Sequence, residues 1–156
     1  MRALVAGLGA LLVAAATSCS DQGNLYIRCP DAGGGVALND GNVTIDAVVM
    51  RVAADLTAPA GATDGMSFAI ELNFPHVPTM RGVRVECVRV RRVTESVQWD
   101  AVPRLTEETH DGSNARVRST GRDGPHWRPE DLVDVTIWLR TASGRHVLAI
   151  GRQPIH

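Results

Sequence analysis

The chain has 156 residues, of which 44% are hydrophobic and 21% are charged, a size and composition sufficient for one folded domain with a core. Its net charge is −1 at neutral pH, which argues against a general nucleic-acid binder. Only 4% of the residues are aromatic, so we expect a core built mainly of Val, Ile, Leu and Ala.

The first residues have the layout of an export signal. Met1 and Arg2 give a positive start, and residues 3–16 form an uninterrupted apolar run. A membrane-spanning helix needs roughly 20 apolar residues, whereas the apolar region of a secretory signal has about 7–15. We therefore predict an exported protein whose residues 1–18 are a signal peptide.

Two cleavage sites compete at the end of this run. An A-x-A site would be cut after Ala16 and would leave Cys19 as an odd thiol. Alternatively, residues 16–19, with the sequence ATSC, resemble the lipobox of bacterial lipoproteins. The resemblance covers residues 1–19 only, and Ala16 stands where the commonest form of the motif has Leu.

The lipobox resemblance implies that Cys19 becomes the acylated first residue of the mature protein, with the membrane as its partner through this lipid anchor. Residues 19–23 would then form the lipidated cysteine and a short tether. The resemblance also implies a location facing the periplasm or the cell surface. In a Gram-negative host, Ser20 in place of Asp favours the outer membrane.

The three cysteines of the chain fit this interpretation. Acylation of Cys19 removes the odd thiol and leaves Cys29 and Cys87 as a pair. Disulfides form and persist outside the cytoplasm, so we expect these two residues to be linked. The alternative is two buried free thiols.

Alternation of apolar and polar residues with a period of two dominates the mature chain and predicts strands. We expect strands at residues 24–29, two more within residues 34–55 around a turn at Asn39-Asp40-Gly41-Asn42, and another at residues 65–74. The Asp-Gly pair tolerates the positive φ angles of a tight hairpin turn.

The next strands are predicted at residues 82–93, 96–102 and 131–150, the last of these containing a turn at Ser143-Gly144. In residues 82–93 the apolar positions change from odd to even numbers. A one-residue slip would turn the second half's apolar side chains to solvent, so we predict a β-bulge near Cys87.

Seven to nine such strands predict an all-β fold, an antiparallel β-sandwich of immunoglobulin-like architecture formed by residues 24–156. Antibody-type domains have a Trp between their paired cysteines, and none lies between Cys29 and Cys87. The likeness therefore concerns the architecture alone.

Residues 103–130 are rich in charged residues, Gly, Ser and Asn and poor in aliphatic residues, which predicts a long loop with at most a short strand at residues 115–119. Because binding residues concentrate on loops held by rigid scaffolds, we expect the partner to bind here. Trp127 is either a plug over the end of the sandwich or an exposed anchor. The candidate binding residues are His110, Asp111, Arg122, His126, Trp127 and Arg128.

Short catalytic motifs are absent, so we predict no enzyme and no cofactor. The residues closest to a metal-ligand set are His110, Asp111, Asp123 and His126, but unpaired loop histidines are common and we predict no metal.

A basic stretch could dock to an anionic partner or form a solvated or edge-strand face, and we favour the second interpretation. This stretch contains Arg81, Arg84, Arg89, Arg91 and Arg92.

These features together predict a membrane-anchored exported lipoprotein that acts as a non-enzymatic binding or assembly module at the cell envelope. Its partner would be an envelope protein. The alternative is an exported protein that binds a small ligand or a metal, and an enzyme without a recognisable motif comes third.

Overall fold

The computed structural model describes residues 27–61 and 64–156, and Cys19 with the predicted signal peptide lies outside this part of the chain. Almost all regular structure is β-strand. The elements are β1 (Val36–Ala37), β2 (Asn42–Ile45), β3 (Val48–Thr57), β4 (Met66–Pro75), the 3₁₀ helix η1 (Pro78–Met80), β5 (Arg84–Arg92), β6 (Gln98–Ala101), β7 (Leu105–Asp111), β8 (Asn114–Gly124), β9 (Leu132–Thr141) and β10 (Gly144–Pro154). Among the described residues, no helix is long and apolar enough to cross a membrane.

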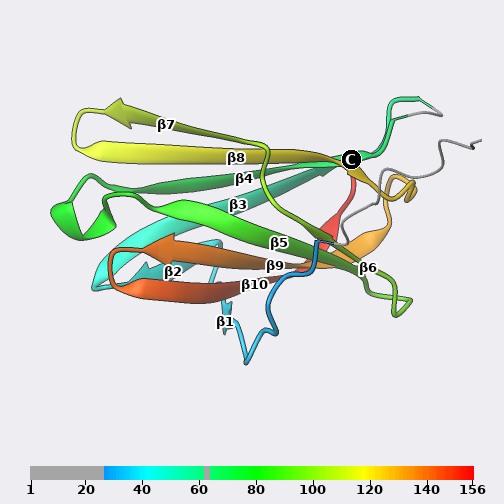
Figure 1. Ribbon diagram of the computed structural model, residues 1–156, viewed down its shortest axis with the longest axis horizontal. Coiled ribbons are helices and arrows are strands. Elements are labelled where there is room, and N and C mark those ends of the chain that lie inside the picture. The colour runs from blue at the N-terminus through cyan, green and yellow to red at the C-terminus, as the bar shows by residue number, and fades with distance from the viewer. Residues whose placement is uncertain (1–26, 62–63) are drawn as a thin grey trace, which may run out of the picture.

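The strands form two five-stranded sheets packed as a sandwich (Figure 1). Sheet I has the order β1-β10-β9-β5-β6, and sheet II has the order β2-β3-β4-β8-β7. The inner order β10-β9-β5 against β3-β4-β8-β7 corresponds to the G-F-C and A-B-E-D order of immunoglobulin-like sandwiches. The predicted fold class is therefore confirmed, with ten strands in the described residues instead of the seven to nine expected.

The core lies between the sheets and is built from alternating residues. In β4, the side chains of Met66, Phe68, Ile70, Leu72 and Phe74 are buried, while the residues between them are only partly covered. Strands β2, β3, β5, β8 and β9 contribute in the same way, whereas every residue of β1 and β7 is exposed. The alternation read from the sequence gives the correct inward face of β4.

The β-bulge predicted near Cys87 is confirmed. The pairing of β5 with β9 shifts by one residue between Val85 and Cys87. Val85 before the shift and Val88 after it are both buried in the core, so the apolar face is kept across the change of phase. The bulge leaves Cys87 and Arg89 on the outer face of sheet I.

The expectation of a long loop at residues 103–130 is corrected, because β7 and β8 occupy most of this segment. β8 lies inside sheet II between β4 and β7, and its inward positions hold small or polar side chains that obscure the apolar alternation. Gly121 is an example: a Cβ atom there would lie 2.3 Å from the ring of Phe68. The Phe68 ring fills the space that a larger residue of β8 would need.

Two expectations near the N-terminus are also corrected. Residues 27–29, the described part of the first predicted strand, form no strand. The turn at Asp40-Gly41 exists, but the chain makes a second turn at Asp46-Ala47 and so forms the hairpin of β2 and β3. Asp46 and Ala47 have φ angles of 52° and 61°, which Ala rarely adopts, so no residue pattern predicted this turn.

Candidate functional site

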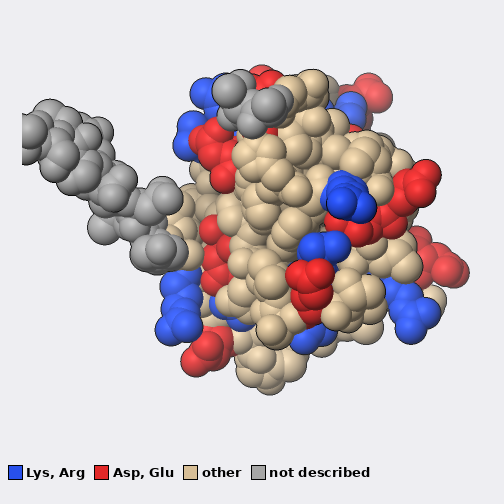
Figure 2. All heavy atoms as spheres, turned by 90° about the vertical axis from the view of Figure 1, so that its right-hand side faces the viewer, with Lys and Arg blue, Asp and Glu red and all other residues tan. Residues whose placement is uncertain are grey.

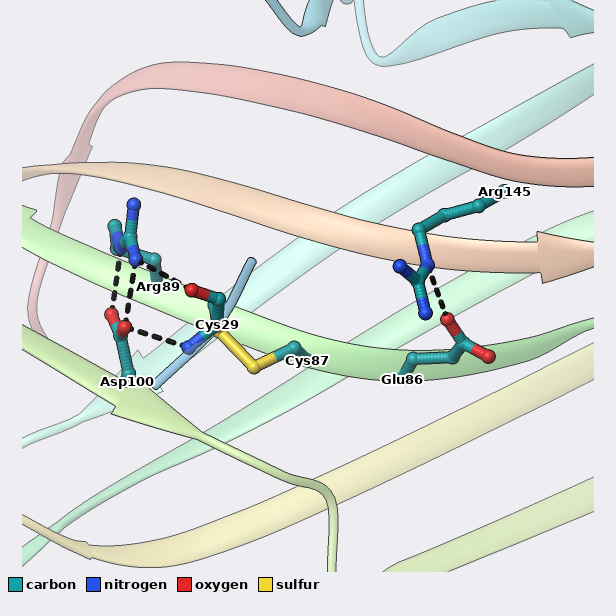
Figure 3. Close-up of a disulfide and its surroundings, with 6 residues drawn as sticks. All are labelled: Cys29, Glu86, Cys87, Arg89, Asp100 and Arg145. Atoms are coloured by element: carbon teal, nitrogen blue, oxygen red, sulfur yellow. Dashed lines mark hydrogen bonds and ion pairs between the residues drawn. A yellow bond between two sulfur atoms is a disulfide. The ribbon is translucent and has the colours of Figure 1, made fainter. Parts of the chain in front are cut away.

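A disulfide joins Cys29 to Cys87 on the outer face of sheet I (Figure 3). Both cysteines are buried, and they pack against Trp138 of the neighbouring strand β9. The predicted pairing is therefore confirmed. Unlike the disulfide of antibody domains, it does not cross the core but attaches the segment before β1 to the surface of the sandwich.

Arg89 and Asp100 hold the same segment by polar contacts. The Arg89 Nε donates to Asp100 Oδ1 at 2.7 Å, and its Nη2 donates to Asp100 Oδ2 at 2.8 Å. The Asp100 Oδ2 also accepts the Cys29 backbone N–H at 2.9 Å, and Arg89 Nη2 donates to the Cys29 carbonyl at 3.2 Å. The Arg89 guanidinium lies 5.2 Å from the ring centroid of Trp138. One covalent bond and two backbone hydrogen bonds thus fix Cys29.

Arg89 and Asp100 form a largely buried ion pair. Only 17% of the Arg89 side chain and 5% of the Asp100 side chain are exposed. The hydrogen bonds to Asp100 raise the pKa of Arg89, against the opposing effect of burial. A bidentate pair of this kind is geometrically specific, so it fixes the position of β6 relative to β5 as well as that of Cys29.

A second ion cluster lies beside the disulfide. Glu86 accepts from Arg145 Nε at 2.7 Å (Figure 3). It also accepts from Arg140 Nε at 2.9 Å. Burial raises the pKa of Glu86, but the two hydrogen bonds lower it by more, so the net pKa lies below the ordinary value of 4.5. Glu86 therefore carries a negative charge among the arginines at neutral pH.

The basic stretch around β5 is largely neutralised by such pairs. Arg91 pairs with Asp134 at 2.9 Å, and Arg92 pairs with Glu95 at 3.1 Å and with Asp131 at 3.2 Å. β5 lies between β9 and β6, so it is not an edge strand. The arginines of β5 accordingly form a solvated, ion-paired strand face, the interpretation favoured from the sequence.

A cleft with a volume of about 750 Å³ lies where the segment before Cys29 meets β6 and the end of β8. Three of its apolar side chains are well exposed: Ile27 at 49%, Val97 at 45% and Val102 at 47%. Arg28 and Arg122 also line it. The end of the sandwich that carries the C-terminus shows a broad tract of uncharged atoms with charged side chains on either side (Figure 2).

The six candidate binding residues of residues 103–130 do not form one site. His110 and Asp111 lie at the end of β7 near the turn into β8, whereas the others lie at or beyond the far end of β8. The eight residue steps of β8 from Asn114 to Arg122 separate the two groups by roughly 25 Å or more. Trp127 is 7% exposed and belongs to the core, which corresponds to a plug and not to an exposed anchor. The far group consists of Arg122, His126, Trp127 and Arg128.

The same separation applies to the weak candidates for metal ligands. Asp123 and His126 lie too far from His110 and Asp111 to share one ion with them. Instead, the fold brings His110 to His76 and Glu108, with one ligand atom of each residue within 4.8 Å of the other two. Sequence reasoning missed this group because His76 is 32 residues before Glu108. The local signal was the Glu-x-His spacing, which places two ligands on one face of a strand.

Comparisons with family models, with curated proteins and with solved structures found no match for this chain. No residue role is therefore carried over from a relative. The roles of the anchored Cys29 segment, the apolar cleft and the His76, Glu108 and His110 group follow from their own geometry.

Proposed function

We propose that this chain is an exported, membrane-anchored lipoprotein whose sandwich is a non-enzymatic binding or assembly module at the cell envelope. The observation that carries the proposal is the attachment of Cys29 to the outer face of sheet I by a disulfide and by the Arg89–Asp100 pair. A disulfide of this kind is typical of proteins outside the reducing cytoplasm.

The attachment also suits a chain that is held by its N-terminus. Cys29 is ten residues after the predicted lipidated Cys19, so an extended chain between them spans at most about 33–36 Å. Because Cys29 itself is fixed, a membrane anchor at Cys19 would limit how far the sandwich moves from the membrane.

The apolar cleft is the surface that best suits a partner of this module. Its exposed Ile27, Val97 and Val102 offer apolar contact, and Arg28 and Arg122 supply positive charge beside it. We therefore place the contact with an envelope protein here, through a segment of the partner that carries apolar side chains and a nearby carboxylate. Interfaces of this composition depend on a few apolar anchors surrounded by polar residues.

Two variants test the two parts of the proposal separately. The Cys19→Ser variant should lose membrane association and labelling by a fatty-acid analogue, and unchanged membrane fractionation would refute the lipid anchor. A photo-crosslinking residue at position 97 should give one discrete adduct in the native envelope.

The same probe at Val49 is the matched control, because Val49 is 60% exposed but lies on sheet II. Equal adducts from positions 97 and 49, or none from either, would contradict the cleft as the binding surface.

A further inference from the structure

His76, Glu108 and His110 lie together at the end of the sandwich opposite the C-terminus. His76 directly follows β4, whose last residue Pro75 pairs with the first residue of β8, and Glu108 and His110 belong to β7. This is the end at which the β7–β8 turn and η1 are seen in Figure 1. The apolar cleft and the anchored Cys29 segment are separate from this group.

The fold holds the three residues in fixed relation to one another. The His76 backbone N–H donates to the carbonyl of Ser113, in the turn between β7 and β8, at 2.7 Å. Glu108 and His110 are two residues apart on β7, so their side chains leave the same face of the strand. These contacts connect the end of β4 to β7 across the intervening strand β8.

Register places this shared face on the inner side of sheet II. Glu108 pairs with Val117 and His110 pairs with Ala115, and both partners are buried in the core. Even so, every residue of β7 is exposed, because sheet I does not cover this strand. Glu108 and His110 therefore face inward while remaining open to solvent.

The distances suit the coordination of one small cation. The three ligand atoms lie within 4.8 Å of one another, and His110 Nε2 lies 3.4 Å from Glu108 Oε1. Zinc bonds of about 2.0–2.1 Å in tetrahedral geometry put neighbouring donor atoms roughly 3.3–3.5 Å apart. One pair already has this spacing. The His76 ring centroid lies 4.5 Å from that of His110, and its ligand atom lies within 4.8 Å of the other two.

Donor chemistry selects the class of metal. Two imidazole nitrogens and one carboxylate oxygen suit Zn²⁺ or Cu²⁺, whereas Ca²⁺ and Mg²⁺ prefer sites made of oxygen alone. We propose that His76, Glu108 and His110 bind one Zn²⁺ or Cu²⁺ ion, with an open position left for water or a donor from another molecule. The inference is independent of the proposed lipid anchor and of the apolar cleft.

A different explanation exists for a charged residue on the inner face of β7. This strand is the edge of sheet II, and inward-pointing charges protect exposed edges from pairing with other chains. Edge protection accounts for Glu108 alone. It does not account for two imidazole rings, one on β7 and one directly after β4, packed edge to face at an interplanar angle of 83° beside that carboxylate.

The test is calorimetric titration of the chelator-treated full chain, with its disulfide intact and no polyhistidine tag, by ZnCl₂ and separately by CuCl₂. We expect saturable binding of one ion per chain for at least one of the two metals. His76→Ala, His110→Ala and Glu108→Gln should each weaken binding by about tenfold or more, since even outer-shell partners of metal ligands contribute 10–100-fold. All three residues are exposed, so the metal-free variants should unfold at the same temperature as the parent chain.

His126→Ala is the matched control, because His126 is an exposed histidine at the other end of the molecule, and it should bind the metal as the parent chain does. The metal should also raise the unfolding temperature of the parent chain but not that of His76→Ala, since an ion that binds only the folded state stabilises it.

Three results would overturn the proposal: no saturable binding of either metal, one-to-one binding that persists in a His76→Ala, His110→Ala double variant, or an equal loss of metal affinity in His126→Ala. Self-association of Glu108→Gln without any metal binding by the parent would assign the residue to edge protection instead.

Discussion

Arg89 on β5 and Asp100 on β6 form a bidentate ion pair, and each of them also hydrogen-bonds to the backbone of Cys29. A single pair therefore joins three segments of the chain: two neighbouring strands and the N-terminal segment. The disulfide and the pair act on the same residue, so the attachment of the N-terminal segment has a covalent part and an electrostatic part that can be removed separately.

Asp100→Asn should destabilise the fold by about 2–3 kcal/mol, because it leaves the largely buried Arg89 charge without its partner. Asp134→Asn is the control, since the Arg91–Asp134 pair is far more exposed and should contribute no more than about 1 kcal/mol. Urea unfolding of both variants measures the difference. Equal losses of unfolding free energy in the two variants would show that the Arg89–Asp100 pair beneath Cys29 stabilises the fold no more than an exposed ion pair does.

Replacing both cysteines by serine should lower the free energy of unfolding by about 4 kcal/mol, the chain-entropy estimate for a crosslink that spans 58 residues. The loss comes mainly from the greater freedom of the unfolded chain, so the double variant should still fold. Calorimetry of the parent and of the Cys29→Ser, Cys87→Ser variant measures the change. An unchanged unfolding temperature would contradict the stabilising role given to the disulfide.

Stability should fall in acid partly through Glu86. Its pKa in the folded chain is below the ordinary value of 4.5, so below that pH the unfolded chain binds more protons than the folded chain. The contribution of Glu86 is thus complete above about pH 4.5 and is lost as the pH falls through the folded pKa. Urea unfolding of the parent and of Glu86→Gln at several pH values tests this. The difference in unfolding free energy between the parent and Glu86→Gln should become smaller as the pH falls. A difference that stays constant with pH would contradict the role given to Glu86.

Gly121→Ala should destabilise the fold by about 1–3 kcal/mol, because the added Cβ atom would overlap the buried ring of Phe68. Gly33→Ala is the control, since a Cβ atom at Gly33 meets nothing within 4 Å. A smaller side chain in Phe68→Leu should relieve part of the cost of Gly121→Ala. If Gly121→Ala were as neutral as Gly33→Ala, β8 would not pack inside sheet II as described.

The parts of the fold that were predictable are those in which aliphatic residues mark the buried face. β4 and β9 alternate clearly, and the change of phase around Cys87 revealed the bulge. Only a short strand at residues 115–119 was expected within β8, and its full length was missed because Ser119 and Gly121 occupy inward positions, where the neighbouring Phe68 supplies the bulk. The polar composition of this segment therefore resembled that of a loop.

The candidate sites were less predictable because they depend on pairing between distant segments. The bond between Cys29 and Cys87 was indicated by the cysteine number together with the expected export and acylation of Cys19. No local pattern joins His76 to Glu108 and His110, since β8 must first pair with both β4 and β7 to bring them together.

The central claim, a lipid anchor at the N-terminus, is tested most directly by mass spectrometry of the N-terminal peptide of the membrane-extracted mature protein. The account predicts a peptide that begins at Cys19 and carries the mass of a thioether-linked diacylglycerol. Because Cys29 and Cys87 are already paired, no other cysteine is free to take this group. A peptide that begins at Thr17 with an unmodified Cys19, as cleavage after Ala16 would produce, would contradict the account.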